Sequence, residues 1–149
     1  METHVGKNLG KFIEAEILSA KESLLISSPG ISLFIGEKIF EQSQKGIKTK
    51  ILTSENGGSD SHETNKLALQ LLRDKKNQQF LDYKIVETQK IEIIHPKIYI
   101  IDNNCAIVGS ANLTKNGFYN FVEFIQLFRN KEEIETIKED YKKLWDLCC

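Results

Sequence analysis

Two apolar runs separated by a short polar turn constrain the fold of this chain more than any other feature. The runs are IIHPKIYII, which ends at Ile101, and CAIVGSAN, which begins at Cys105. Both are rich in β-branched residues, as is typical of buried strands. The residues between them, Asp102, Asn103 and Asn104, are favoured in turns, so the sequence predicts a β-hairpin here.

Polar residues interrupt the first run and end the second. Residues two apart on a strand project to the same face, so His95 and Lys97 are expected to point together, with Pro96 at a bulge or at the end of the ladder. Ser110 and Asn112 are also two apart and share a face if the second strand continues that far. The hairpin therefore combines a nucleophile, a cation and neutral hydrogen-bond donors.

Written as a pattern, the region reads H-x-K-x4-D-x6-G-S-x-N, followed by N-x-x-E at Asn120 and Glu123. It resembles the phospholipase D superfamily, whose H-K-D motif it matches at His95, Lys97 and Asp102. The continuation GSANLTKNGFYNFVE is similar to that of the single-motif nucleases of this superfamily.

The resemblance implies that two copies of the motif meet in one active site, so a chain with a single copy must form a homodimer about a two-fold axis. One His95 would attack phosphorus and form a phosphohistidine, and the partner's His95 would protonate the leaving oxygen. Water activated by that same imidazole would then release the product. The resemblance implies neither a metal nor another cofactor.

The same resemblance implies roles for the remaining motif residues. Lys97 and Asn112 of both chains would bind the phosphodiester and stabilise charge on its oxygens. Glu123 would orient the histidine, and it lies on the apolar face of the run FVEFIQLF, where a carboxylate needs a partner. Supporting positions are Ser110, which would add a hydrogen bond to substrate, Gly109, where the missing Cβ allows close approach to the backbone, and Asn120.

Asp102 is expected to cap the turn rather than to take part in catalysis. On an extended strand it projects away from the face of Lys97 and lies about 17 Å further along. His62, in the polar stretch SENGGSDSHE, is expected to be solvated, whereas Tyr99 and Cys105 are expected to pack in the core.

Alternating periodicities along the chain predict an α/β fold. Together with the resemblance to the phospholipase D superfamily, they lead us to expect a mixed β-sheet flanked by helices on both faces. Helices are expected from about Thr3 to Lys21, after Ser32 until Gly46, through Leu67–Leu72, and over KEEIETIKEDYKKLWDL. Strands are expected at SLLISS, IKTKILT, FLDYKIVET and IEII, besides the hairpin and FVEFIQLF. A chain of 149 residues buries about two-thirds of its surface, so one phospholipase D-like domain is expected over 1–149.

Composition limits the class of protein and its location. Hydrophobic content of 40% and charged content of 28% are ordinary for a globular protein. No apolar run approaches the ~20 residues of a membrane span, and METHVGKNLGKF lacks the layout of a secretory signal, so a cytoplasmic protein is expected. The cysteines predict neither a disulfide framework nor a metal site.

The expected function is that of a phosphodiesterase, most simply an endonuclease that cleaves DNA or RNA. The single motif and lysines at Lys48, Lys50, Lys84, Lys90 and Lys115 favour nucleic acid, although Lys48 and Lys50 suit a solvated strand face better than a phosphate site. A phospholipid-cleaving or phosphatidyl-transferring enzyme is the alternative, and an exposed apolar surface near His95 would favour it. A third reading is a dimeric nucleic-acid-binding module without catalysis.

Overall fold

The computed structural model describes residues 1–55, 62–75, 78–87 and 94–148, and for 62–64 it describes the backbone only. Its centre is a seven-stranded sheet in the order β1-β7-β6-β5-β2-β3-β4. The strands are β1 (Glu2–Gly6), β2 (Ser23–Ser27), β3 (Lys48–Ser54), β4 (Leu81–Val86), β5 (Lys97–Ile101), β6 (Cys105–Gly109) and β7 (Glu123–Phe128). Strands β2, β3 and β4 run parallel to one another, and the other neighbouring pairs are antiparallel.

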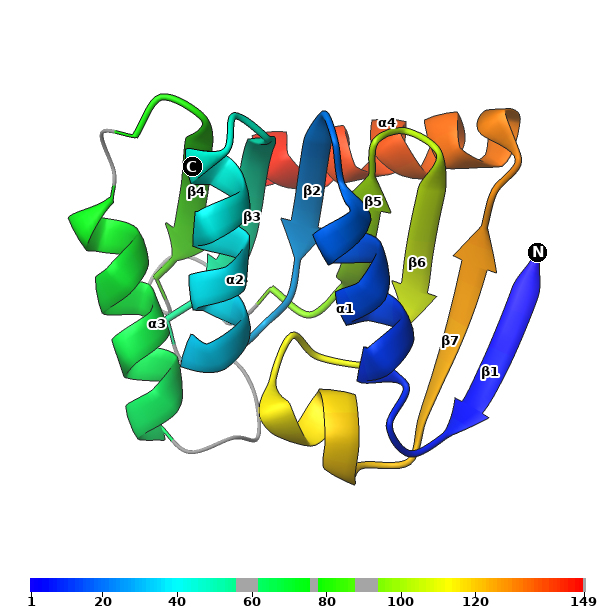
Figure 1. Ribbon diagram of the computed structural model, residues 1–149, viewed down its shortest axis with the longest axis horizontal. Coiled ribbons are helices and arrows are strands. Elements are labelled where there is room, and N and C mark those ends of the chain that lie inside the picture. Colours follow the sequence, from blue (N-terminus) through cyan, green and yellow to red (C-terminus); the bar gives the residue numbers. More distant parts are fainter. Residues whose placement is uncertain (56–61, 76–77, 88–93, 149) are drawn as a thin grey trace.

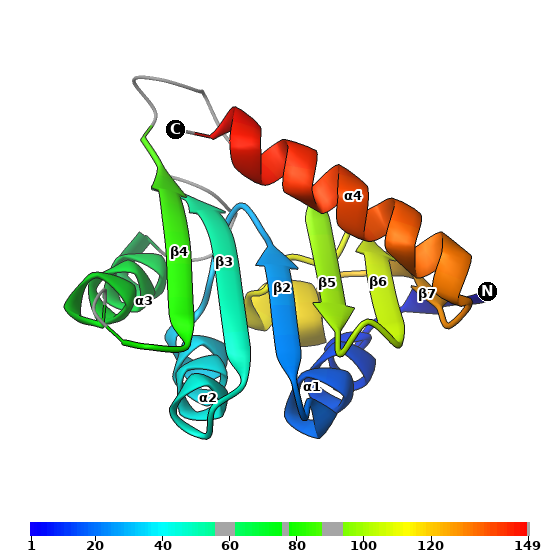
Figure 2. The ribbon, with the colours of Figure 1, turned by 90° about the horizontal axis from the view of Figure 1, so that it is seen from above.

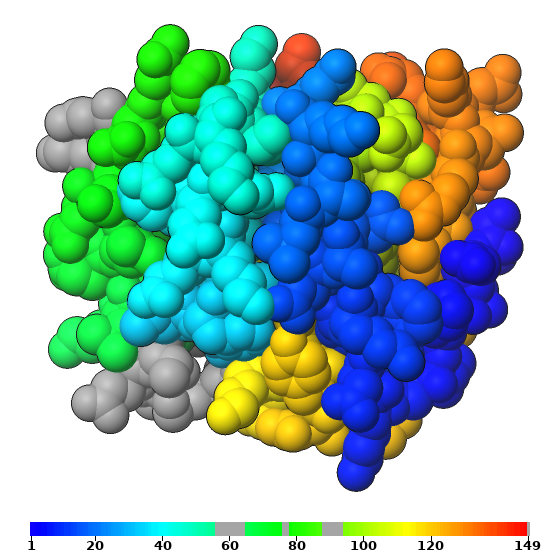
Figure 3. Space-filling model, in the orientation of Figure 1, coloured from blue at the N-terminus to red at the C-terminus, as the bar shows by residue number. Residues whose placement is uncertain are grey.

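Helices cover both faces of this sheet, which confirms the predicted fold class. Helices α1 (Gly10–Ser19), α2 (Leu33–Gln44) and α3 (His62–Asp74) lie on one face, and α4 (Lys131–Leu147) crosses the other (Figure 2). A short π-helix, η1 (Asn116–Asn120), lies beside α1. Figure 3 shows α3, α2 and α1 side by side across this face, with the η1 segment filling the space below α1 and α2.

The first element differs from the prediction of one helix from about Thr3 to Lys21. The chain begins with β1 instead, and α1 starts only at Gly10. Gly6 has a φ of +139° and Asn8 a φ of +61°, and both conformations interrupt a helix. Because β1 pairs along its length with β7, contacts with a distant strand override the local periodicity.

The other predicted elements within the described residues are confirmed, with small shifts at their ends. Strand β5 begins at Lys97, so Pro96 stands at the end of the ladder, as expected. Strand β6 ends at Gly109, however, so Ser110 and Asn112 lie beyond the strand rather than on it. Residues 91–93 of the predicted IEII strand fall outside the described residues, and Ile94 lies before β5 without belonging to a strand.

The core lies in two layers. The larger layer, between the sheet and α1 to α3, includes Ile13, Ile26, Ile35 and Tyr99. The smaller layer lies under α4, where Tyr141 packs with Ile100, Ala106 and Ile134. Each strand of the β5–β6 hairpin therefore has its two faces buried in different layers, which explains its continuous apolar sequence.

One end of the sheet gathers the motif residues. Strand β5 begins there at Lys97, β6 ends there at Gly109 and β7 begins there at Glu123, and η1 lies next to them (Figure 1). We call this the η1 end. Helices α1, α2 and α3 also start at this end, so their positive dipole ends point toward it (Figure 1).

Candidate active site

His95 and Lys97 lie together at the start of β5. His95 is exposed, and the Nζ atom of Lys97 lies 3.0 Å from its Nδ1 and 3.2 Å from its Nε2. The ammonium thus stands close to both ring nitrogens. The predicted common orientation of the two side chains is confirmed, and it places a cation within reach of any anion that contacts the imidazole.

Lys97 is also coupled to Glu123. Partial burial lowers the pKa of the Lys97 ammonium, and the negative charge of Glu123 opposes that shift. This electrostatic interaction links the start of β5 to the start of β7, across β6. Lys97 therefore contacts His95 and also feels the negative charge of Glu123.

Ser110 connects the end of β6 to the start of β7. Its hydroxyl donates to the carboxylate of Glu123 and also accepts from the backbone N–H of Phe124 at 3.0 Å. Within the described residues, the hydrogen-bond partner found for Glu123 is Ser110 rather than His95. The carboxylate thus has the partner that its place on an apolar strand face demands.

Gly109 permits the close approach that brings these residues together. A Cβ at this position would lie 2.2 Å from the carbonyl O of Phe124 and 2.8 Å from the Cα of Ile125. Only glycine fits there without moving the backbone of β7. The close approach expected from the sequence is therefore made by the neighbouring strand.

Asn112 lies just beyond Ser110, in a segment that the core holds in place. The hydroxyl of Tyr99 donates to the carbonyl O of Ala111 at 2.7 Å, and Tyr99 is buried. The Oδ1 atom of Asn112 is buried without a hydrogen-bond partner among the described residues. A Cβ on Gly117 would lie 2.5 Å from the carbonyl O of Asn112, so η1 packs directly against this residue.

Buried serines outside the motif also shape this segment. The backbone N–H of Leu113 donates to the Oγ of Ser28 at 2.9 Å, and that of Lys115 donates to the Oγ of Ser32 at 2.9 Å. Ser32 stands at the N-cap of α2, but its hydroxyl accepts from the backbone N–H of Lys115 and makes no capping hydrogen bond to the helix. The signal available in the sequence was a serine pair, Ser27 and Ser28, that ends an otherwise apolar run.

Helix η1 is attached to the scaffold from outside the motif. The hydroxyl of Tyr119 donates to Glu14 on α1 at 2.8 Å, and Lys38 on α2 pairs with the same carboxylate. Asn120, expected as a supporting residue, lies in η1 and donates to Asn116 Oδ1 at 2.6 Å. Its observed contact thus stabilises η1 itself.

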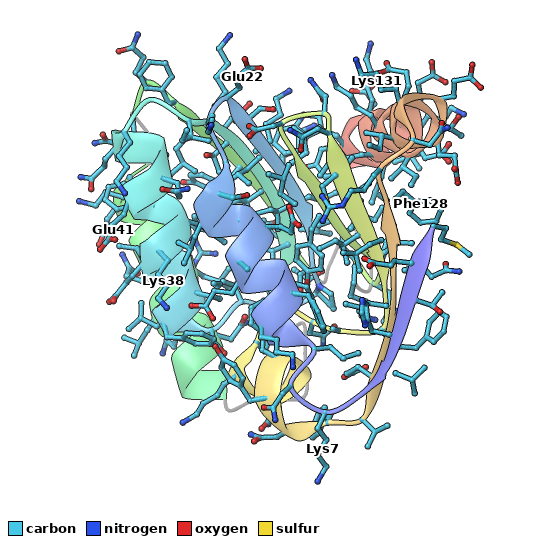
Figure 4. The ribbon with its side chains drawn as sticks, turned by 45° about the vertical axis from the view of Figure 1, so that its right-hand side comes forward. Lys7, Glu22, Lys38, Glu41, Phe128 and Lys131 are labelled. Atoms are coloured by element: carbon cyan, nitrogen blue, oxygen red, sulfur yellow. The ribbon has the colours of Figure 1, made fainter. Side chains whose placement is uncertain are left out.

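Asp102 lies at the opposite end of β5 from Lys97. Its carboxylate accepts from the backbone N–H groups of Lys21, Glu22 and Ser23 at 2.7 to 2.9 Å. Burial raises the pKa of Asp102, but these three hydrogen bonds outweigh it and hold the pKa below its usual value. Figure 4 shows Glu22 at the end of the molecule opposite to Lys7, which projects from the η1 end. The carboxylate holds the start of β2 to the β5–β6 turn.

Several other candidates lie away from His95. Lys50 stacks over the ring of Trp145 at 5.0 Å, and Lys84 donates to the carbonyl O of Trp145 at 2.9 Å, so both are engaged with α4. Burial raises the pKa of Cys105 to about 12, in agreement with a packed, unreactive thiol. Lys90 and the side chain of His62 fall outside the described residues. Among those described, no group of three or more His, Cys, Asp or Glu side chains could hold a metal ion.

A groove of about 1240 Å³ opens under α4, at the end of the sheet opposite to the η1 end. Lys48 and Lys50 line it, together with Trp145 and Asp146. Its lining carries five lysines and five acidic residues, so the charges balance and favour no ionic ligand. The chemistry of the motif is therefore separate from this groove.

Comparison with known proteins identifies the fold and the family. Residues 13–145 match the family described as "Cardiolipin synthase, PLD-like domain". The chain belongs to the phospholipase D-like family. This match covers most of the chain and confirms the resemblance seen in the motif.

Individual relatives of this phospholipase D-like chain are distant. Mitochondrial cardiolipin hydrolase from Mus musculus is 24% identical over 148 residues, which are 96% of this chain and 60% of that protein. This chain therefore spans about three-fifths of the length of that curated relative. None of the helices within the described ranges has the length and apolar character needed to cross a membrane.

Two solved structures share the fold of this phospholipase D-like chain almost from end to end. NucT from Helicobacter pylori is 22% identical with a TM-score of 0.78, and the match covers 99% of this chain and 96% of that one. The phospholipase D family member Nuc from Salmonella typhimurium is 19% identical with a TM-score of 0.79 and the same coverage. The likeness shows a common fold.

Proposed function

We propose that this chain is a phosphodiesterase that cleaves nucleic acid at a composite site formed by a homodimer. The observation that carries the proposal is the cluster at the η1 end, where an exposed imidazole stands 3.0 Å from an ammonium that interacts electrostatically with Glu123 of the Ser110–Glu123 pair. Such a cluster supplies a nucleophile together with positive charge for the oxygens of a phosphodiester.

In the first step, one ring nitrogen of His95 attacks phosphorus, a P–N bond forms and the P–O bond to the leaving group breaks. The partner subunit's His95, protonated at this stage, gives its proton to the departing alkoxide. Lys97 and the amide of Asn112 stabilise the negative charge on the oxygens of the phosphoryl group. In the second step the partner's imidazole takes a proton from water, the water oxygen attacks phosphorus and the P–N bond breaks, which regenerates both histidines.

The need for two imidazoles supports a dimer. The chain has three histidines, and His4 lies on β1, where it stacks on Phe12 with ring centroids 4.1 Å apart. A second His95 from another chain is the simplest source of the acid. Exposed apolar side chains next to Glu123 offer the contact surface such a dimer needs: Val5, Phe121, Val122 and Phe124, which we call the β1–β7 apolar surface.

Nucleic acid is supported by the charge at the η1 end. Lys7 is exposed there (Figure 4), Lys115 is exposed at the start of η1, and Lys97 is part of the site. Three helix N-termini also point toward this end (Figure 1). This arrangement suits a polyanion that extends beyond one phosphate. The lysines at 48, 50 and 84 lend less support than the sequence suggested, because Lys50 and Lys84 contact Trp145 and Lys48 lines the distant groove.

A phospholipid substrate is the second candidate, and the β1–β7 apolar surface is the observation that favours it. Val122 is 68% exposed and directly precedes Glu123. Such a surface could contact acyl chains instead of a second subunit. The name of the similar mitochondrial cardiolipin hydrolase agrees with this alternative.

A substrate panel tests the proposal. Purified protein is incubated in EDTA with labelled single-stranded DNA, duplex DNA, RNA, and vesicles of phosphatidylcholine with cardiolipin. We expect cleavage of a nucleic acid, loss of that cleavage in His95→Ala, and a covalent phosphoryl-protein adduct on acid quenching that is absent in His95→Ala. Cleavage of lipid alone would support the second candidate. Activity that requires added Mg²⁺ or Zn²⁺ would contradict the mechanism.

A further inference from the structure

His95 lies between two residues whose backbone groups are held by buried serines. The Oγ of Ser27 donates to the carbonyl O of Pro96 at 2.9 Å, and the backbone N–H of Ile94 donates to the Oγ of Ser54 at 2.5 Å. We propose that Ser27 and Ser54 are positioning residues that fix the backbone on both sides of His95. The inference rests on the proposed function, in which His95 is the nucleophile.

The two serines end neighbouring strands of the sheet. Ser27 is the last residue of β2 and Ser54 the last of β3, and these strands are parallel neighbours. The ladder between β2 and β5 ends at the pair of Ser27 and Ile98, before Pro96 is reached. The Ser27 side chain therefore continues the attachment of this segment to β2 where backbone pairing stops.

Burial makes both hydrogen bonds effective restraints. Ser27 is 0% exposed and Ser54 is 1% exposed, so water does not compete for their hydroxyls. The side chain of Ile94 is buried as well and packs with Leu52, Val86 and Cys148. Ile94 is thus fixed through its N–H and its side chain, and Pro96 through its carbonyl and its ring-restricted φ.

The consequence concerns the nucleophile. The imidazole of His95 is exposed, yet the backbone that carries it is tied to two adjacent strands, so its position is restrained without covering the ring. In-line attack on phosphorus depends on such restraint, since a displacement of about 1 Å can cost on the order of a hundredfold in rate. Both serines lie far from the motif in the sequence, so the motif pattern does not include them.

The experiment compares Ser27→Ala and Ser54→Ala with Ser43→Ala. Ser43 is a matched control because it is also buried, at 3% exposure, and donates to a backbone carbonyl, that of Phe40, at 2.6 Å on α2. We expect kcat to fall about tenfold to a hundredfold in Ser27→Ala and Ser54→Ala, with KM changed less than about twofold. Ser43→Ala should keep kcat. If an alanine variant fails to fold, the corresponding cysteine variant, Ser27→Cys or Ser54→Cys, replaces it. Cysteine has a similar volume to serine and forms weaker hydrogen bonds, so we expect a smaller fall in kcat.

A second readout does not depend on activity. The ring signals of His95 in ¹H–¹³C NMR spectra, assigned by their loss in His95→Ala, should shift in Ser27→Ala and Ser54→Ala and stay in place in Ser43→Ala. Unshifted His95 signals, or a kcat equal to that of Ser43→Ala, would overturn the inference. If the wild-type protein cleaves no substrate, the proposed function fails, whereas the NMR comparison still decides whether the serines position His95.

Discussion

The hydroxyl of Ser110 donates to the carboxylate of Glu123, and this hydrogen bond joins the end of β6 to the start of β7 beside Lys97. If the pair acts as a unit, the two substitutions must be non-additive. We expect Ser110→Ala and Glu123→Gln each to lower kcat/KM by about tenfold or more, and the double variant to lose little beyond the worse single variant. A double-mutant cycle on kcat/KM measures this coupling. Strictly multiplicative losses would mean that the two residues act separately.

Substitution of the residues proposed to contact the phosphodiester should affect activity far more than folding. We expect His95→Ala to lower kcat by about a thousandfold or more, and Lys97→Ala or Asn112→Ala by about a hundredfold or more. His95 is exposed and Lys97 only partly buried, so melting temperatures should change little for these two. Lys48→Ala, an exposed lysine at the other end of the sheet, serves as the control for lost positive charge and should retain activity.

Asp102 should contribute to stability instead. Asp102→Ala removes the acceptor of three backbone N–H groups and places alanine at a φ of +54°, so we expect a loss of about 2–3 kcal/mol in the free energy of unfolding. Activity per folded molecule should remain close to wild type. Asp102→Asn, which tolerates this φ and retains an acceptor oxygen, should lose less. An inactive Asp102→Ala protein of wild-type stability would contradict this structural role and indicate a role in catalysis.

The same residue predicts a pH dependence. Because the folded pKa of Asp102 lies below its ordinary value of about 3.9, the folded state favours the ionised carboxylate. Its contribution is complete above that value and is lost as the pH falls through the folded pKa. The difference in unfolding free energy between wild type and Asp102→Asn, measured with urea, should therefore be constant from about pH 5 to 7 and shrink below about pH 4. A constant difference down to pH 2 would contradict this account.

How far the sequence alone predicts this molecule depends on the range of the interactions involved. Local patterns were sufficient for β2, α2 and β3, whose boundaries follow apolar periodicity and the glycine or proline residues beside them. For α4, apolar periodicity alone was sufficient. They were not sufficient for β1, because a strand at the edge of the sheet is defined by its pairing with β7.

In the candidate site, too, short-range relationships could be predicted from the sequence and long-range contacts could not. The spacing of His95 and Lys97 predicted their common orientation because one strand end determines it. The contacts from Ser28 and Ser32 to the Leu113–Lys115 segment, and from Glu14 to Tyr119, join residues more than 80 positions apart. No local pattern encodes such pairs, and a buried serine looks the same in sequence whether it fills space or holds a loop.

The β1–β7 apolar surface should be the contact between subunits. Placing a charge there would oppose dimer formation, so Val122→Glu should shift the protein toward monomer and lower nuclease activity in parallel. Leu67→Glu is the matched control, because Leu67 is 50% exposed but lies on α3. Light scattering after size-exclusion chromatography measures the mass. If Val122→Glu remains dimeric and loses only its activity on lipid vesicles, the surface binds lipid and not a second subunit.

A homodimer with one composite site also predicts how activity depends on subunit composition. Wild-type and His95→Ala chains are mixed in varying proportions, subunit exchange is confirmed by mass spectrometry, and cleavage is measured at constant total protein. Each mixed dimer lacks either the nucleophile or the acid, so only dimers of two wild-type chains are active. Activity should follow the square of the wild-type fraction and fall to roughly a quarter at an equal mixture, whereas independent sites leave roughly half. A linear response would mean that each chain works alone and that a second proton-transfer group, with His62 the first to test, lies within the same chain.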